Sequence, residues 1–421
     1  MRKRILWAIV YLLSIMIPFA VEKIDLFVGA DPCEPAPSEA RVTVENFLYW
    51  SFTHSGFRRP RSHQVVVVKL VLSELPAPIF QNLCEQRRFL AALVDNLNES
   101  GPSLIVIDKY FSPDGCPNEQ ANSELLRAFA TASKQTPIII GSRTFTESEW
   151  ALHHGTVTQE DKRRFGSACL VLAPAIDFAG LTKSDQIFSG LIRLNFDVRK
   201  IPLEWLTYPA DFLGQATPIP SLAFAAAQVR DPELVNTKTI QQYVAGRHHP
   251  LTSFLEPHAI PELSAADLMC NTPAADQIHL KGCKKIDQKL RRVLKGRVVV
   301  IGDDSEADRH PTGTPLGKVP GVLLQANYIE SLLDDRYFRP MPNSFVLGAA
   351  IFWVLLIEVL FSQMKSPEVA VALWVVLVCV SLGVCWVVLA AIGTLTFGGV
   401  AGTPLLVLSK YADAYKDRLK K

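Results

Sequence analysis

The stretch Gln64–Leu72 reads QVVVVKLVL. Its β-branched residues follow one another with hardly any polar alternation, which predicts a strand that is covered on both faces. Ser103–Phe111 (SLIVIDKYF) and Thr136–Arg143 (TPIIIGSR) have the same character. Strands buried on both faces are typical of a parallel sheet with helices on either side.

Amphipathic segments separate these strands. Apolar residues at helical spacing predict one helix after Pro78 and a second helix over Glu119–Ala130. The apolar residues that define the two helices are Leu83, Leu90, Leu93, Val94 and Leu97 in the first and Leu125, Leu126 and Phe129 in the second. Because strands and helices alternate, we predict an α/β fold, with a mostly parallel sheet flanked by helices and right-handed crossovers.

The rest of this block is less regular. Further predicted elements are strands at Cys169–Ile176, Gly190–Phe196 and Gly296–Gly302 and helices at Pro220–Val229 and Pro320–Leu333. The segment 231–290 is rich in Pro, Asp and Lys, and we interpret it as an insertion near the outer surface. The last helix should turn five side chains inward, namely Val322, Leu323, Ala326, Ile329 and Leu333.

The composition excludes two broad classes of protein. The chain has 421 residues, a net charge of +2, 49% hydrophobic residues and 20% charged residues. This balance excludes a disordered polyampholyte and a nucleic-acid-binding chain with a large basic excess. Apolar residues concentrate in four runs that are almost free of charge: Ile5–Val21, Phe345–Phe361, Val369–Ala390 and about Thr394–Leu408. Each run approaches or reaches the ~20 residues that span a bilayer, so we expect one N-terminal and three C-terminal transmembrane helices.

Basic residues predict which side of the membrane each segment occupies. Lysine and arginine precede the first run, follow the second at Lys365 and follow the fourth from Lys410 onward. With a cytoplasmic amino terminus, four crossings place all of them inside, as the positive-inside rule requires. The central block then lies in the periplasm or extracellular space of a multi-pass plasma (inner) membrane protein. A cleaved signal peptide is the alternative for the first run, and cleavage would leave the block on the same side.

This topology divides the chain into four parts. They are 1–34 (basic tip, first helix and linker), 35–341 (outer domain), 342–409 (three membrane helices) and 410–421 (short basic tail). The tail is too short to fold alone.

Six of the eight cysteines lie in the outer block, where disulfides persist. Six cysteines allow fifteen pairings. Cys270 and Cys283 bracket a short polar segment and are the first candidate pair. Cys84 and Cys116 are the second, because both flank the carboxyl edge of the predicted sheet.

Polar residues follow the predicted strands at that same edge, where ligands of parallel sheets bind. The candidate ligand-binding residues are Asp108, Arg143, Asp303, Asp304, Asp308 and His310. One interpretation is a polar cleft around Asp108 and Arg143, with His310 as a ligand contact or pH-responsive group. The other is a structural ion pair that closes the sheet edge and also uses Lys69. The sequence shows neither metal-ligand spacing nor a nucleotide-binding motif, so we expect no metal and no cofactor.

The segment Gly296–Leu333 resembles the closing motif of the type-two CHASE family, the cyclases/histidine kinases-associated sensory extracellular domains. Matching residues are Gly302, Asp308, Thr314, Pro315, Pro320, Gly321, Val322, Ala326 and Asn327. The strands QVVVVKLVL and SLIVIDKYF are similar to the first two of that family, with Asp108 at its aspartate position. The first strand departs from the family pattern, because it runs through Lys69 to Ser73 and Glu74 where the family usually has acidic residues.

The resemblance implies a membrane-anchored extracytoplasmic sensor and not an enzyme. Family members usually continue into a cytoplasmic output domain, whereas this sequence ends shortly after the last apolar run. The resemblance therefore implies that the signal passes through the C-terminal membrane helices to a separate cytoplasmic or membrane signalling partner. Expected partners also include membrane lipid and, as an open alternative, a second copy of the chain, but no nucleic acid.

Two alternatives remain open at this point. The outer domain could be a structural or docking subunit of a membrane complex that senses no ligand. It could also be an outer-facing hydrolase that uses Asp108, Asp303, Asp304 and His310.

Overall fold

The computed structural model describes the following residues: 10–11, 64–71, 74–75, 79, 81–112, 115–146, 170–172, 186–194, 198, 201–206, 218–237, 240–241, 250–252, 259–269, 288–311, 317–340, 343–364, 366–392, 394–395 and 403–419. Contacts divide the chain into two units. The sheet unit comprises Pro32–Ala40 and Arg59–Tyr337, and the helical unit comprises Met1–Asp31, Arg41–Arg58 and Phe338–Lys421. Cys270, Cys283 and all of Ile5–Val21 except Val10 and Tyr11 lie outside the described residues.

A parallel six-stranded sheet forms the centre of the sheet unit. Its strand order is β10-β1-β11-β2-β3-β6, and every neighbouring pair is parallel. The strands are β1 (Val65–Leu70), β2 (Leu104–Ile107), β3 (Ile138–Ser142), β6 (Ile187–Leu191), β10 (Glu262–Ser264) and β11 (Val298–Asp303). β1, β2 and β11 are almost wholly buried, which explains why their sequences show no polar alternation. The predicted α/β class and parallel sheet are confirmed.

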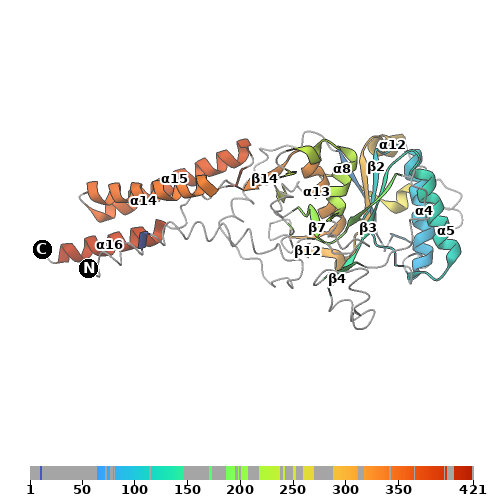
Figure 1. The fold of residues 1–421 in the computed structure, drawn as a ribbon, viewed down its shortest axis with the longest axis horizontal. Coiled ribbons are helices and arrows are strands. Elements are labelled where there is room, and N and C mark those ends of the chain that lie inside the picture. Colours follow the sequence, from blue (N-terminus) through green and yellow to red (C-terminus); the bar gives the residue numbers. More distant parts are fainter. Residues whose placement is uncertain are drawn as a thin grey trace. The chain divides into compact units, whose positions relative to one another are not determined.

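Helices cover both faces of this sheet (Figure 1). α4 (Leu83–Glu99) and α5 (Glu119–Ala132) pack on one face, and α8 (Leu222–Arg230) and α13 (Gly321–Leu333) pack on the other. The larger core cluster joins α4 and α5 to the sheet through side chains such as Leu93, Phe129 and Ile105. Asparagine or serine side chains accept hydrogen bonds from the first turns of α4, α5 and α8 and so fix where each helix begins.

Short elements complete the sheet unit. They are β4 (Thr144–Thr146), β5 (Leu170–Leu172), β7 (Glu204–Leu206), β8 (Pro218–Pro220), β9 (Leu251–Thr252), β12 (Arg309–Pro311), β13 (Lys318–Pro320), α10 (Ala265–Leu268), α12 (Gln288–Leu294) and the 3-10 turns η3 (Leu234–Asn236) and η4 (Glu306–Asp308). β4 pairs with β5, β7 with β8 and β12 with β13, all antiparallel.

The structure corrects three details of the sequence interpretation. The strand expected at Cys169–Ile176 is the short β5, which pairs with β4 outside the main sheet. The presumed insertion 231–290 contributes β10, an edge strand of the main sheet. α13 is buried on most of its sides, so Leu324 and Leu332 are fully buried although the expected face did not include them.

Among the described residues, the helical unit contains three long helices, the helical residues Val10 and Tyr11, and two short strands. α14 (Asn343–Gln363) and α15 (Pro367–Ile392) follow one another, and α16 (Thr403–Leu419) ends the described chain. β14 (Tyr337–Pro340) precedes α14 and pairs in parallel with β15 (Thr394–Leu395), which follows α15.

Among the described residues, one segment is long and apolar enough to cross a membrane, Pro367–Val384 in α15. A shorter apolar segment, Leu347–Gln363, occupies most of α14. The expected count of one plus three transmembrane helices therefore stays a prediction. Part of the fourth apolar run, 396–402, lies outside the described residues.

Three segments of the helical unit meet at the carboxylate of Glu358 on α14. Lys410 of α16 approaches it with Nζ 2.5 Å from Oε1, and the hydroxyl of Tyr11 donates to the same oxygen at 2.5 Å. Apolar contacts between Ile357 and Leu406 surround this contact. Glu358 is therefore paired within the helical unit.

Candidate functional site

The carboxyl edge of the parallel sheet gathers most of the predicted site residues. In the sheet register Lys69 of β1 lies beside Gly302 of β11, and Leu70 lies beside Asp303. The backbone N–H of Asp108, just past β2, donates to the carbonyl oxygen of Ile301 at 2.8 Å. Neighbouring parallel strands therefore end at one level and present Asp108, Asp303 and Lys69 together.

Ion pairs connect the charges at this edge. Lys69 Nζ lies 2.5 Å from Oε2 of Glu262 and 2.9 Å from Oδ2 of Asp304. Burial lowers the pKa of Lys69, but the two carboxylates outweigh burial and raise its pKa overall. Asp304 also accepts from Nη2 of Arg309 at 3.2 Å. The structural ion-pair interpretation, including its use of Lys69, therefore describes a large part of this edge.

Lys109 and Asp303 form a second pair, with Nζ 2.9 Å from Oδ2. The other carboxylate oxygen of Asp303, Oδ1, is buried and has no hydrogen-bond partner among the described residues. One acceptor at the edge is therefore left available, next to a cation that is already paired.

Asp108 is the most perturbed acid of the site. Burial, followed by the nearby Asp308 and Asp303 carboxylates, raises the pKa of Asp108 to about 8, while Lys109 lowers it only in part. Asp108 is therefore mostly protonated at neutral pH and can donate a hydrogen bond that an ordinary aspartate cannot.

Two glycines let α13 approach this edge closely. A Cβ atom at Gly302 would lie 2.7 Å from the Cβ of Val322 and 3.2 Å from the Cβ of Asp108. A Cβ atom at Gly321, the first residue of α13, would lie 2.7 Å from Oδ2 of Asp308. Asp308 therefore sits at the positive N-terminal end of α13, where a carboxylate is stabilised by the helix dipole.

The six predicted site residues fall into two groups. Asp108, Asp303, Asp304 and Asp308 lie together at the edge, and Asp308 brings His310 with it, since Nε2 of His310 lies 3.5 Å from Oδ1 of Asp308. Arg143 is exposed, and its guanidinium lies 4.4 Å from the ring centre of Phe145. No hydrogen bond or ion pair between the described residues joins Arg143 to Asp108, so the expected cleft around these two residues is not formed by a direct contact.

A small cleft opens beside the second ion pair, between α4 and the sheet edge. It encloses about 250 Å³ of empty space, part of which is open to solvent. Its lining is mostly apolar, with the polar groups of Gln86, Lys109 and Asp303, and consists of Leu70, Leu75, Ile79, Gln86, Phe89, Leu90, Lys109 and Asp303. Only about 10 Å³ of this space can hold the centre of a water molecule, which is room for about one water. The cleft in this form is therefore far smaller than an ordinary small-molecule site.

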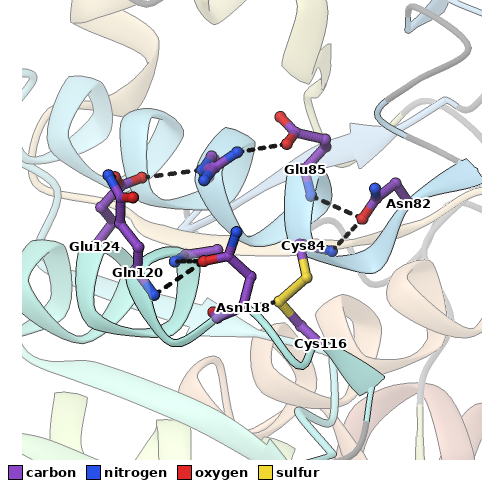
Figure 2. A network of polar contacts seen from close by, with 9 residues as sticks. Asn82, Cys84, Glu85, Cys116, Asn118, Gln120 and Glu124 are labelled. Atoms are coloured by element: carbon purple, nitrogen blue, oxygen red, sulfur yellow. Dashed lines mark hydrogen bonds and ion pairs between the residues drawn. A yellow bond between two sulfur atoms is a disulfide. The ribbon is translucent and has the colours of Figure 1, made fainter.

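A disulfide fixes the loop that follows Asp108. Cys84 in the first turn of α4 is bonded to Cys116, with their Cα atoms 5.0 Å apart (Figure 2). The predicted Cys84–Cys116 pair is thus present. Beside it, the buried guanidinium of Arg87 donates to the backbone carbonyl of Ser112 and to the side chain of Asn122. The first turn of α4 is therefore joined covalently to the loop before α5 and by hydrogen bonds to that loop and to the first turn of α5.

Two residues that form ion pairs at this edge were not predicted from the sequence. Glu262 lies in the segment that was interpreted as an insertion, and Arg309 follows the recognised aspartates without a distinguishing pattern. Only the pairing of β10 with β1 brings Glu262 to Lys69.

Metal chemistry finds no support in the part of the chain that the structure describes. No group of three or more His, Cys, Asp or Glu side chains there could hold a metal ion. The edge is instead a set of paired charges around a protonated aspartate.

Comparison with known families gives one match. A family model described as the CHASE2 domain matches residues 42–360, which is most of the chain. The match includes the whole carboxyl edge described above as well as α13 and most of α14. No curated protein and no solved structure matches the chain.

Proposed function

The chain belongs to the CHASE2 domain family, and from this premise we propose that it is a membrane-anchored extracytoplasmic sensor. CHASE2 domains are extracellular sensory domains, so the sheet unit would be the part that meets the signal. The signal would then pass through apolar helices to a separate partner protein.

The course of α13 carries this proposal. The helix begins beside Asp308 at the carboxyl edge and packs on β1 and β11. After its last residue, Leu333, the chain continues directly into β14 and then into the apolar α14. Since a packed helix moves as a rigid body, a displacement at the edge would reach the segment that enters α14. A ligand produces such a displacement only if it binds two arrangements of the edge with different affinities.

The surfaces of α14 and α15 support membrane anchoring. Large apolar side chains on both helices are exposed within the chain, including Phe352, Leu355, Val376 and Val380, each more than half exposed. Exposed apolar surface of this extent is unfavourable in water and fits a lipid environment.

Topology is tested with single cysteines in intact cells. We expect an impermeant maleimide to label a Thr131→Cys variant, at an exposed site on α5, in intact cells. A Tyr415→Cys variant, at an exposed site on α16, should react only after the cells are broken open. The unsubstituted chain is the control for background labelling. The proposal of an outer sensor fails if the Thr131 position is protected until lysis.

Relay to a partner is tested by crosslinking in native membranes. A photoreactive amino acid at Tyr415 of α16 should capture a protein whose yield changes when Asp108→Ala alters the carboxyl edge. The same probe at Val380 of α15 is the control, because this lipid-facing position should capture little protein. A partner that is captured with the same yield in the wild type and in Asp108→Ala would contradict sensing and favour docking.

The docking alternative has one observation in its favour. Lys69, Lys109 and Arg309 are already neutralised by carboxylates within the protein, which leaves few free charges for a ligand. A structural subunit would keep the charges of its carboxyl edge paired internally in this way. It would be recognised by crosslinks from the sheet unit to other envelope proteins, with no dependence on Asp108.

A further inference from the structure

A group of buried charged residues lies at the opposite end of the sheet unit, where α13 ends. Glu330 is 0% exposed, Asp334 is 5% exposed and Arg336 is 4% exposed. Nε of Arg336 lies 3.2 Å from Oδ2 of Asp334. We call these three residues the α13 terminal cluster.

Glu330 ties α13 to the beginning of the first strand. Its carboxylate accepts the backbone N–H of Val65 at 2.8 Å and that of Gln64 at 3.1 Å. These two residues open β1, so one side chain satisfies two backbone donors that precede the regular ladder. The attachment of β1 to α13 at this end therefore depends on Glu330.

The charges of the cluster do not balance among the described residues. Two carboxylates face one guanidinium, so full ionisation leaves a net negative charge in a buried place. A buried unpaired charge is costly, and uptake of one proton removes it. Arg336 forms its ion pair with Asp334, whereas the hydrogen bonds that Glu330 accepts among the described residues come from backbone N–H groups, so Glu330 is the group that gains the proton.

Charged groups on neighbouring elements do not change this balance. Arg297 precedes β11 and Arg230 ends α8, and both elements pack on α13. Neither arginine forms an ion pair with Glu330 among the described residues. The charged groups that act on Glu330 are Asp334 and Arg336 from its own end of α13.

We propose that the α13 terminal cluster is a proton-binding site, and that release of the proton from Glu330 loosens the attachment of β1 to the end of α13. Ionisation strengthens the hydrogen bonds from Gln64 and Val65, but the cost of burying the charge exceeds that gain. An ionised Glu330 is therefore more stable in water than in the closed arrangement. Burial, with a smaller contribution from Asp334, raises the pKa of Glu330 to about 7, although the two backbone N–H donors and Arg336 lower it in part. The change therefore falls in the neutral range.

The backbone next to the cluster is suited to such a change. Asp335 has φ +53°, a left-handed conformation that residues other than glycine seldom adopt. The N–H of Arg336 donates to the carbonyl of Ser331 at 2.8 Å and ends the helix at this turn. The chain then continues into β14, so the proton site lies at the exit from the sheet unit. A signalling role for pH rests on the proposed function. The existence of the proton site does not depend on that function.

Hydrogen exchange of the full-length protein in lipid nanodiscs tests the proposal. Between pH 6 and pH 8, after correction for intrinsic exchange, we expect several-fold loss of protection in peptides covering 64–70 and 328–337, with a midpoint near pH 7. A peptide within α4 serves as the control and should keep its protection. Unchanged protection of both junction peptides would overturn the proposal, whatever the partner experiments give.

Two variants separate titration from a merely structural role. Glu330→Gln keeps the shape of the side chain but cannot ionise, so its junction should stay protected at pH 8. Asp334→Asn removes the neighbouring anion and frees Arg336, so the midpoint should move to lower pH. A wild-type pH response in Glu330→Gln, or an unmoved midpoint in Asp334→Asn, would contradict the assignment to Glu330. If Glu330→Gln fails to fold, the wild-type midpoint and the Asp334→Asn shift still decide.

Discussion

At the scale of single residues, Gly302 and Gly321 let α13 approach the carboxyl edge of the sheet. Gly302 leaves room for Val322 and for Asp108, and Gly321 leaves room for Asp308. These close contacts hold the start of α13 against the sheet edge.

Gly302→Ala should lower the free energy of unfolding of the sheet unit by about 1–3 kcal/mol, because the added Cβ would overlap Val322 on a packed helix. Chemical denaturation followed by circular dichroism measures the change. Gly348→Ala in α14 is the control, since a Cβ there meets no atom within 4 Å. Equal stability of Gly302→Ala and the wild type would mean that α13 shifts at little cost.

Asp108 predicts a dependence of stability on pH. Its folded pKa of about 8 lies above its ordinary value of 3.8, so the folded state binds a proton that the unfolded state releases. This contribution to stability is fully present below about pH 4 and is lost as the pH rises through about 8. In the Asp108→Asn variant, which cannot ionise, the denaturation midpoint should change less between pH 6 and pH 9. An unaltered pH profile would place the titration on another group.

At the same scale, the sequence predicted which acidic residues lie at the sheet edge, but not which residues their neighbours contact. Asp108, Asp303 and Asp304 follow buried strands, and strand ends meet at one edge of a parallel sheet. Arg143 also follows a strand, but its side chain turns to Phe145. Side-chain direction at a strand end depends on local packing, which no sequence pattern reports.

At the scale of elements, the disulfide joins α4 to the loop before α5 and closes a loop of chain between positions 32 residues apart. Cys84→Ser should lower the free energy of unfolding by about 3 kcal/mol, since the unfolded chain regains the freedom of that loop. Denaturation with and without a reducing agent measures it. Reduction should destabilise the wild type by about 3 kcal/mol more than it destabilises Cys84→Ser. A variant as stable as the oxidised wild type would contradict a stabilising bond.

Elements with strong periodicity were predictable, and β10 was not. α4 and α5 combine apolar spacing with asparagine caps, and β1, β2 and β11 are continuous apolar strands. β10 has three residues and only partly buried side chains, so it carries no apolar run. It becomes a strand through pairing with β1, a contact between segments far apart in the sequence.

At the scale of the whole molecule, the contrast between mixed and apolar sequence predicts four parts, and contacts divide the chain into two units with one boundary near Tyr337. Charge balance within the helical unit was harder to foresee. Glu358 and Lys410 are 52 positions apart, and only the packing of α14 on α16 brings them together.

A double-mutant cycle on Glu358 and Lys410 should show a coupling free energy of about 1 kcal/mol. Either Glu358→Gln or Lys410→Met alone leaves one charge without its ionic partner in an apolar bundle, whereas the double variant leaves none. Resistance of the membrane-embedded chain to denaturation by detergent measures the four proteins. Additive effects of the two substitutions would show that the contact contributes no coupling.

The pairing of β14 with β15 has a mechanical consequence. One strand immediately precedes α14 and the other immediately follows α15, and their residues meet at Arg339 with Thr394 and at Pro340 with Leu395. Tension applied to the start of α14 is therefore distributed to the far end of α15 as well. The paired strands would make α14 and α15 tilt together, and neither helix would slide along its own axis independently of the other.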